Sequence, residues 1–281
     1  MPFTVSHVAA VLPLAVGRPG RTLVPTALVI GSMVPDLPYF VPPYRGSDWT
    51  HAAYGPVTVD LAAGLVLLAI WHFLLVRPLT DFAPTWVGQR LPDPVPLRGA
   101  RWGWAALSVV LGSYTHVLLD ALTHPGRWGT TRLAWLNVLV GPLPAYKWLQ
   151  FGLGALGLLI LVVWTVVWLD EAQPHGAVRS RLTSTQRVAA WLAVLGVFLA
   201  SIVVIGASGF RDGLPTEEVA IGVATGSMSL TAAVVICSCL VRQVDDRLDR
   251  GSRQGPADGA QGGPGERSGD QPVGGRQRGQ Q

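Results

Sequence analysis

Five apolar stretches, each about the length of a membrane-spanning helix, dominate the pattern of hydrophobic and polar positions along the chain. A helix rises ~1.5 Å per residue, so about 20 mostly apolar residues are needed to cross ~30 Å of hydrocarbon. The pattern therefore predicts an all-α fold, a polytopic membrane helix bundle of about five spans. The windows that meet the length requirement are Pro56–Val76, Trp102–Leu122, Gln150–Leu169, Val188–Ser208 and Val219–Val241.

An earlier segment, residues 22–41 (TLVPTALVIGSMVPDLPYFV), is apolar enough to be a sixth span. It is interrupted by Pro25, Pro35 and Pro38, and Asp36 lies near its end. Proline removes a helical hydrogen bond, and broken helices are tolerated at membrane depth only where other protein elements cover them. We therefore expect an N-terminal re-entrant or half-inserted helical segment, with a complete sixth span as the alternative.

The composition agrees with a membrane protein. Of the 281 residues, 49% are hydrophobic and 14% are charged, and the mean hydropathy is +0.39, which is more apolar than an ordinary soluble domain. Residues 1–250 are expected to form one membrane helical domain. Residues 251–281 consist mainly of Gly, Gln, Arg and Pro and are expected to be a disordered tail, because such a segment buries too little apolar surface to offset its ordering entropy.

The net charge of +4 comes mostly from arginines in the predicted loops and the tail. No basic patch with interleaved aromatic residues accompanies it, so no nucleic-acid partner is expected. One side of the predicted bundle carries more Lys and Arg than the other, which places the C-terminal tail in the cytoplasm and the N-terminal segment outside. Cys237 and Cys239 lie two apart in an apolar helix and point away from each other, so we expect free thiols.

The second predicted span ends in SYTHVLLDALTHPG, where His116, Asp120 and His124 are each four residues apart. Side chains at this spacing lie along one face of a helix, and Pro125 and Gly126 are expected to end it. Imidazole and carboxylate groups are common ligands of Zn²⁺, and ionisable groups in membrane spans are usually functional. The alternative is that these residues lie in the headgroup region, where water makes polar side chains inexpensive.

Further histidines and aspartates precede the first span or lie one turn inside it. Under the five-span topology these residues fall on the same membrane face as the stripe on the second span. This convergence predicts a divalent-metal site, most simply zinc, at the extracytoplasmic face. No role is expected for His72, near the other end of the first span, or for His175, in a polar loop. The candidate metal ligands are His7, Asp36, His51, Asp60, His116, Asp120 and His124.

Several segments, in their order along the chain, resemble a bacterial membrane family catalogued as domain of unknown function 4184. The resemblance covers nearly all the chain except the tail and implies a multi-pass protein of the bacterial inner membrane. The segments that carry it are PFTVSHVAAVLPL, ALVIGSMVPDLPYF, WTHAAYGPVTVDLAAGLVLLAIWHFLLVRPL, LGSYTHVLLDALTHPGRWG and PLPAYKWLQFG.

The chain is also similar, more distantly, to membrane-bound metal-dependent hydrolases, and through them to zinc-dependent phospholipase C and related nucleases. The shared features are an early His, a Pro-Asp pair after a glycine, a Thr-His pair before a span, and a His-x₃-Asp in a later span. This similarity implies phosphoester hydrolysis at metals held by His and Asp on helices. The matching residues here are His7, Asp36, His51, His116 and Asp120.

Two positions depart from the hydrolase pattern. Asp36 is followed by Leu-Pro-Tyr and not by a further Asp or His, and His51 is followed by Ala52 where serine is usual. The presence of a second metal is therefore left open, with His124 or Asp60 as the candidates for a missing ligand.

The function we expect is that of an integral-membrane metal-dependent hydrolase acting on a lipid or another phosphoester. Arg127 or Lys147 could hold a phosphate on the same face, although both also suit the role of interfacial anchors. Two alternatives remain open. One is a cation or proton transporter, which the intramembrane Asp60 and Asp120 favour, and the other is a catalytically inactive membrane scaffold. The substrate, the oligomeric state and the metal's identity are not determined by the sequence.

Overall fold

The structure of the protein, a computed structural model, describes residues 4–16, 22–41, 48–92, 96–174 and 182–253. One compact unit contains Met1–Gln243, and a second contains Val244–Gln281. The elements are helical apart from one short hairpin, so the predicted all-α class is confirmed. Most of the predicted disordered tail lies outside the described residues, and its disorder stays a prediction.

Five helical stretches are long and apolar enough to cross a membrane, which is compatible with a multi-pass membrane protein. Each overlaps one of the five predicted windows, so the predicted number and order of the spans are confirmed. The first consists of α3 (Val59–Ile70), a π-helical turn (Trp71–Leu75) and α4 (Val76–Phe82). The others are α6 (Arg101–Thr123) with the short α7 (Trp128–Arg132), then α8 (Ala145–Glu171), α9 (Ser184–Arg211) and α10 (Thr216–Arg253).

The π-helical turn in the first span has a local cause. Pro78 has no N–H to donate, so the carbonyl of Leu74, four residues earlier, loses its helical partner. The side-chain amide of Gln243 donates to this carbonyl at 2.9 Å and also to the carbonyl of Phe73 at 2.9 Å. A polar side chain of α10 thus satisfies the backbone groups that the proline leaves open, as is required in an apolar environment.

The segment before the first span forms α2 (Pro25–Gly31) and the 3₁₀ helix η3 (Val34–Tyr39). Seven residues of α-helix extend about 10 Å, which is far too short to cross a bilayer. The alternative of a complete sixth span is therefore wrong. The prolines at the start of α2 and within η3 limit the helices to these lengths.

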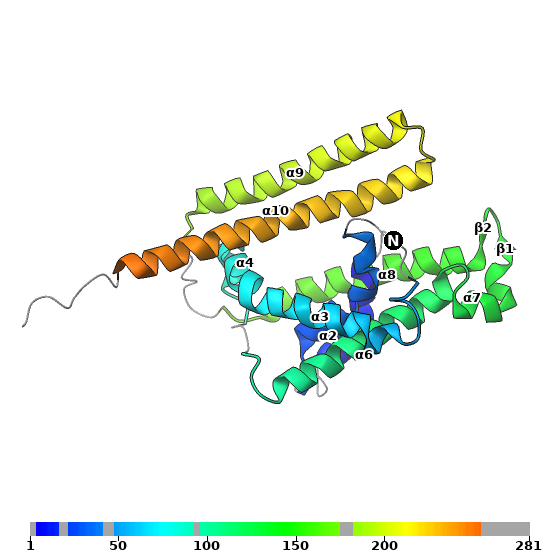
Figure 1. Ribbon diagram of the computed structural model, residues 1–281, viewed down its shortest axis with the longest axis horizontal. Coiled ribbons are helices and arrows are strands. Elements are labelled where there is room, and N and C mark those ends of the chain that lie inside the picture. Colours follow the sequence, from blue (N-terminus) through cyan, green and yellow to red (C-terminus); the bar gives the residue numbers. More distant parts are fainter. Residues whose placement is uncertain (1–3, 17–21, 42–47, 93–95, 175–181, 254–281) are drawn as a thin grey trace, which may run out of the picture. The chain divides into compact units, whose positions relative to one another are not determined.

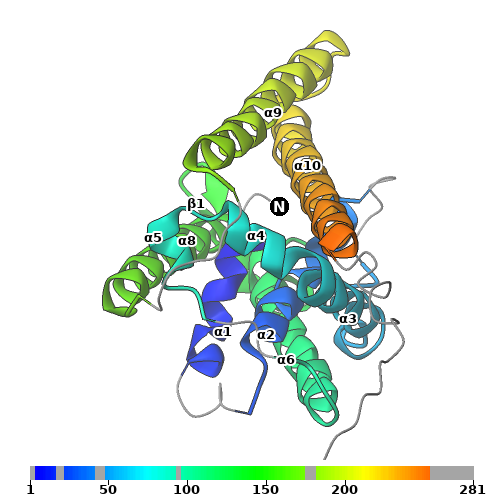
Figure 2. The same cartoon turned by 90° about the vertical axis from the view of Figure 1, so that its left-hand side faces the viewer.

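Glycines allow α2 to lie directly against α6. A Cβ atom on Gly31 would collide with the backbone of Val109, and one on Gly112 would collide with the carbonyl of Leu28. The backbone N–H of Val24 also donates to Ser108 Oγ of α6 at 2.9 Å. Figures 1 and 2 show α2, α3 and α6 side by side. This close approach brings the C-terminal end of α2, and η3 after it, next to the middle of α6.

The N-terminal helices complete the packing around α6. The 3₁₀ helix η1 (Thr4–His7) leads into α1 (Val8–Ala15). A Cβ atom on Gly157 of α8 would collide with the carbonyl of Ser6, so η1 lies directly on α8. Figure 2 shows α1 close to α2 and α6. His7 is therefore held between α6 and α8.

Short elements connect the long helices at their ends. A two-stranded antiparallel hairpin, β1 (Leu139–Val140) and β2 (Leu143–Pro144), is the one departure from an all-helical structure among the described residues. Gly141 at its turn has φ +63°, a conformation that glycine adopts without strain. The remaining short helices are η4 (Gly55–Val57), α5 (Thr85–Gly88) and η6 (Ala134–Asn137).

Candidate metal centre

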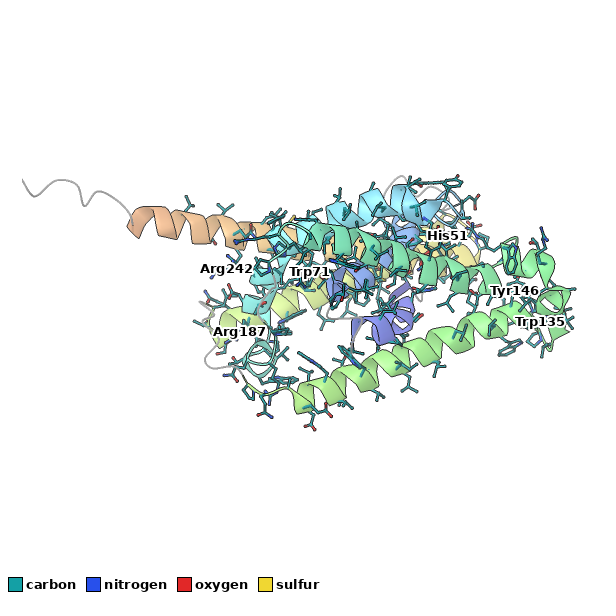
Figure 3. All side chains as sticks on the ribbon, turned by 90° about the horizontal axis from the view of Figure 1, so that it is seen from below. His51, Trp71, Trp135, Tyr146, Arg187 and Arg242 are labelled. Atoms are coloured by element: carbon teal, nitrogen blue, oxygen red, sulfur yellow. The ribbon has the colours of Figure 1, made fainter. Side chains whose placement is uncertain are left out.

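Four of the seven candidate ligands meet in one buried group. Asp36 comes from η3, His51 from the loop before η4, and His116 and Asp120 from α6. One ligand-type atom from each of these residues lies within 4.8 Å of the corresponding atoms of the other three. Figure 3 shows the labelled His51 next to α6. Residues separated by most of the N-terminal half of the chain thus form one cluster, which can hold a metal ion.

His116 directs its Nε2 atom into this group. Its Nδ1 atom lies 2.7 Å from the carbonyl oxygen of Ser32, and because a carbonyl can only accept, Nδ1 carries a proton. Nε2 lies 3.5 Å from both Asp36 Oδ1 and Asp120 Oδ2, where it can hold a proton that faces the carboxylates or exchange that proton for a metal ion. This buried nitrogen has no hydrogen-bond partner within the described ranges.

The ring of His51 is oriented in the same way. The Thr50 hydroxyl donates to the carbonyl of Pro35 at 2.8 Å, so its oxygen accepts from His51 Nδ1 at 3.1 Å. His51 Nε2 faces the group and lies 3.1 Å from Asp120 Oδ2, within hydrogen-bond distance, and 3.6 Å from Asp36 Oδ1. The Ser32 carbonyl therefore orients the His116 ring directly, and the Pro35 carbonyl orients the His51 ring through the Thr50 hydroxyl. In both rings Nε2 is directed toward the group.

Neutral imidazole lone pairs and carboxylate oxygens repel one another at these distances unless a proton or a cation lies between them. A metal ion suits the separations that the structure shows. With bonds of ~2.0–2.2 Å to nitrogen and oxygen at tetrahedral angles, neighbouring ligand atoms are about 3.4 Å apart. The four separations between the inward-facing nitrogens and oxygens run from 3.1 to 3.6 Å. The residues therefore fit a divalent ion in distance, orientation and charge.

Asp36 is held as a carboxylate from two sides. Burial alone would raise the pKa of its carboxyl group, but the adjacent His116 ring and a hydrogen bond from Thr4 bring the pKa below its ordinary value. The Thr4 hydroxyl donates to Oδ2 at 2.6 Å. Oδ1, which faces the two histidines, has no hydrogen-bond donor in the part of the chain that the structure describes. One carboxylate oxygen is thus anchored and the other is available to a cation.

His7 borders the four-residue group without being a member of it. Its ring stacks on that of His116, with centroids 3.8 Å apart and an interplanar angle of 19°, and its Nε2 atom lies 3.4 Å from Asp120 Oδ1. Burial, followed by the proximity of His116, lowers the pKa of His7 to about 4. The ring is therefore neutral at physiological pH and retains a lone pair for a ligand.

His124 lies on the opposite side of Asp120 from the group. Helix α6 ends at Thr123, and His124 has an extended backbone with φ −121°. Of the three residues predicted to share one helix face, only His116 and Asp120 therefore lie in the helix. The Nδ1 atom of His124 lies 3.2 Å from Asp120 Oδ1, and its Nε2 atom lies 2.6 Å from the amide nitrogen of Gln150 on α8. With the amide donating to Nε2, Nδ1–H donates to Asp120 and orients it.

Gln150, Thr4 and Ser32 support the group and were not singled out in the sequence, and Thr50, which also supports it, was noted only as part of the Thr-His pair. Gln150 gave the clearest signal, because an amide in the early turns of an otherwise apolar span needs a partner. Thr50 precedes His51 directly, but its role depends on the position of the Pro35 carbonyl, which is a tertiary feature.

The structure does not bring the last candidate, Asp60, into the four-residue group. Asp60 is fully buried on α3, and its Oδ2 atom accepts a hydrogen bond of 2.7 Å from Ser113 of α6. Its Oδ1 atom has no hydrogen-bond partner among the described residues.

The two histidines without an expected role do not join the site either. His72 lies in the π-helical turn and packs edge-on against Phe73. His175 is outside the described residues.

A small cavity of about 50 Å³ borders the group. The polar residues His7, Asp120, His124 and Gln150 line it, together with the apolar Leu119 of α6 and Leu153 of α8. Asp120, a member of the group, and His7, which stacks on His116, both line the cavity. Water or a small polar group can therefore approach the cluster between the two helices.

The comparisons with known proteins identify one family. The family model described as "Domain of unknown function (DUF4184)" matches residues 1–241, which include all five spans except the end of the last. No curated protein and no solved structure matches the chain. The match covers every residue of the cluster and the residues that support it, Thr4, Ser32, Thr50, His124 and Gln150.

Proposed function

The chain belongs to the DUF4184 family, and we propose that it is an integral-membrane metal-dependent hydrolase acting on a lipid or another phosphoester at the extracytoplasmic face. One observation carries the proposal. Two carboxylates and two imidazole Nε2 atoms converge in a buried group, and Nδ1 of each ring donates to an oxygen outside the group so that Nε2 faces inward. A cavity lined by His7 and Asp120 adjoins that group.

Asp36, His51, His116 and Asp120 are the residues that would hold the ion, with zinc as the first candidate from its preference for imidazole and carboxylate. When bound, such an ion activates water as a nucleophile near neutral pH and polarises the ester. His7, neutral and facing the cavity, can accept a hydrogen bond from that water or serve as a further ligand. His124 and Gln150 keep Asp120 in place during the reaction.

The overall reaction is hydrolysis of a phosphoester. The oxygen of water forms a bond to phosphorus, the P–O bond to the leaving alcohol breaks, and the alcohol oxygen takes a proton that water has lost. Arg127 and Lys147 are candidates for holding the phosphate. Arg127 follows α6 and pairs with the exposed Asp48 at 3.3 Å, so the Arg127 guanidinium would have to exchange that partner for a substrate.

The test is turnover by the detergent-purified, zinc-loaded protein, with bis(p-nitrophenyl) phosphate as a soluble chromogenic probe. We expect metal-dependent release of nitrophenol that is lost in His116→Ala and kept in His72→Ala, which removes a histidine of the same chain outside the cluster. Metal-loaded protein that releases no nitrophenol and cleaves no phospholipid would contradict the hydrolase proposal.

A structural metal in a non-enzymatic membrane protein is the second candidate, because four protein ligands can complete a tetrahedral shell by themselves, whereas catalytic zinc keeps a position open. This candidate expects one tightly held ion, a loss of thermal stability on chelation, and no turnover of any phosphoester. The hydrolase proposal expects the same ion together with turnover.

A further inference from the structure

The cavity beside the cluster lies where two spans meet, and its lining is chemically mixed. His7, Asp120, His124 and Gln150 contribute polar groups to the lining, and Leu119 and Leu153 contribute apolar ones. Leu153 is 36% exposed on the protein surface, although it belongs to the apolar span α8. In a membrane, this exposed edge of the cavity faces lipid and not water.

The depth of the cavity along the spans is set by the ends of α6 and α8. Asp120 lies three residues before the end of α6, and Gln150 lies five residues after the start of α8. At ~1.5 Å per residue these positions are about 5 and 8 Å from the helix ends. Since α8 has 27 residues and is about 40 Å long, its ends extend beyond the ~30 Å hydrocarbon layer. The cavity is thus at the level of the boundary between headgroups and acyl chains.

The size of the cavity restricts what can enter. About 50 Å³ accommodates a small polar group or a few water molecules, but not a hydrocarbon chain. A lipid that presented its phosphoester to the cluster would have to leave its tail outside. The outward surface of α8 beyond Leu153 offers a continuous apolar path for that tail, with Leu156 51% and Leu159 59% exposed.

From the mixed lining, the exposed Leu153, the depth and the size together, we propose that the substrate is a membrane lipid that enters sideways between α6 and α8. Its phosphoester reaches the cluster past Leu119 and Leu153, and its hydrocarbon tail stays in the bilayer against α8. This proposal rests on the proposed hydrolase function, because it specifies the substrate class of the same site. It expects lipid phosphoesters to be cleaved faster than water-soluble ones such as bis(p-nitrophenyl) phosphate.

The test uses the full-length protein in nanodiscs of phosphatidylglycerol that include a photoactivatable phosphatidylglycerol with a diazirine next to the glycerol backbone. Cross-links are mapped to the cavity-lining positions Asp120 and Gln150, which lipid around the outside of the helices does not reach. In Leu153→Trp the indole fills the apolar edge of the cavity. Leu158→Trp places the same ring on the same helix at a residue that is also 36% exposed but does not line the cavity, and it is the matched control.

We expect cross-links at Asp120 and Gln150 in the natural protein, at least tenfold fewer in Leu153→Trp, and no change in Leu158→Trp. Equal labelling in the two variants, or no labelling of these positions in the natural protein, would overturn lateral lipid entry. Labelling requires binding but no turnover, so the result stands even if the hydrolase proposal fails. Conversely, efficient cleavage of the soluble diester without any cross-link at these positions would leave the hydrolase and exclude the lipid route.

Discussion

His51 Nε2 lies 3.1 Å from Asp120 Oδ2, although 69 residues separate the two along the chain. The contact joins a loop before the first span to the last turn of the second. It requires α2 to lie against α6, because that packing places Ser32 and Asp36 beside His116. The cluster is therefore a consequence of how the N-terminal segment packs on α6.

The Thr50 hydroxyl sets the tautomer of His51, so its removal should weaken metal binding. In Thr50→Val the Nδ1 proton loses its acceptor and the ring loses its orientation, whereas Thr50→Ser keeps the hydroxyl. We expect Thr50→Val to lower the metal affinity by about 10- to 100-fold, the usual cost of removing such a supporting hydrogen bond. Titration with a competing fluorescent chelator measures this affinity. If Thr50→Val and Thr50→Ser bind zinc alike, Thr50 does not set the tautomer.

The hydrogen bonds from Gln150 to His124 and from His124 to Asp120 should also support metal binding, from the side of α8. Replacing Gln150 with leucine removes the partner 2.6 Å from His124 Nε2 and frees the ring that orients Asp120. We expect a fall of about 10- to 100-fold in metal affinity, measured by the same chelator titration. Leu149→Ala, on the adjacent position of α8, should change the affinity by less than threefold. An equal effect of both substitutions would point to a general disturbance of α8.

The contact between α2 and α6 depends on the absence of a side chain at Gly112. In Gly112→Ala the new Cβ would collide with the Leu28 carbonyl, so we expect a loss of about 1–3 kcal/mol or more of stability from overpacking. Gly103→Ala, in the same helix with no atom within 4 Å of the added Cβ, should be neutral or stabilising by up to ~1 kcal/mol. Unfolding in detergent with chelator present separates this packing effect from metal binding.

Removal of the metal should lower the thermal stability of the natural protein and leave a ligand-deficient variant unchanged. A ligand that binds only the folded state stabilises it by about 2.7 kcal/mol at 100 times its dissociation constant. Chelation should therefore lower the melting temperature of the natural protein by several degrees and have no effect on His116→Ala. A melting temperature that chelator does not change in either protein would mean that the folded state holds no ion.

The five spans could be predicted from the sequence because length and hydrophobicity are local properties, readable in each window by itself. The i, i+4 spacing of His116 and Asp120 was informative for the same reason. The inclusion of Asp36 and His51 depended on topology and on a family resemblance, and the structure brings both residues to α6.

Other parts of the site depend on tertiary packing that no window of sequence contains. His124 leaves the predicted stripe because the helix ends one residue before it. The close packing of Gly31 against α6 and of Gly112 against α2 could not be predicted, because a glycine in an apolar helix does not by itself indicate a helix contact. Asp60 is a residue type that binds metals, and it lies near the membrane face predicted for the site. Its carboxylate instead accepts a hydrogen bond from Ser113, at a contact between α3 and α6 outside the four-residue group.

The central claim is that Asp36, His51, His116 and Asp120 hold a metal ion, and the most direct measurement is the metal content of the detergent-purified protein. Inductively coupled plasma mass spectrometry would compare the natural protein with His116→Ala and His72→Ala after identical purification. We predict about one equivalent of a divalent metal, most simply zinc, in the natural protein and in His72→Ala, and less than a tenth of an equivalent in His116→Ala. Natural protein without bound metal, or equal metal in all three, would contradict the claim.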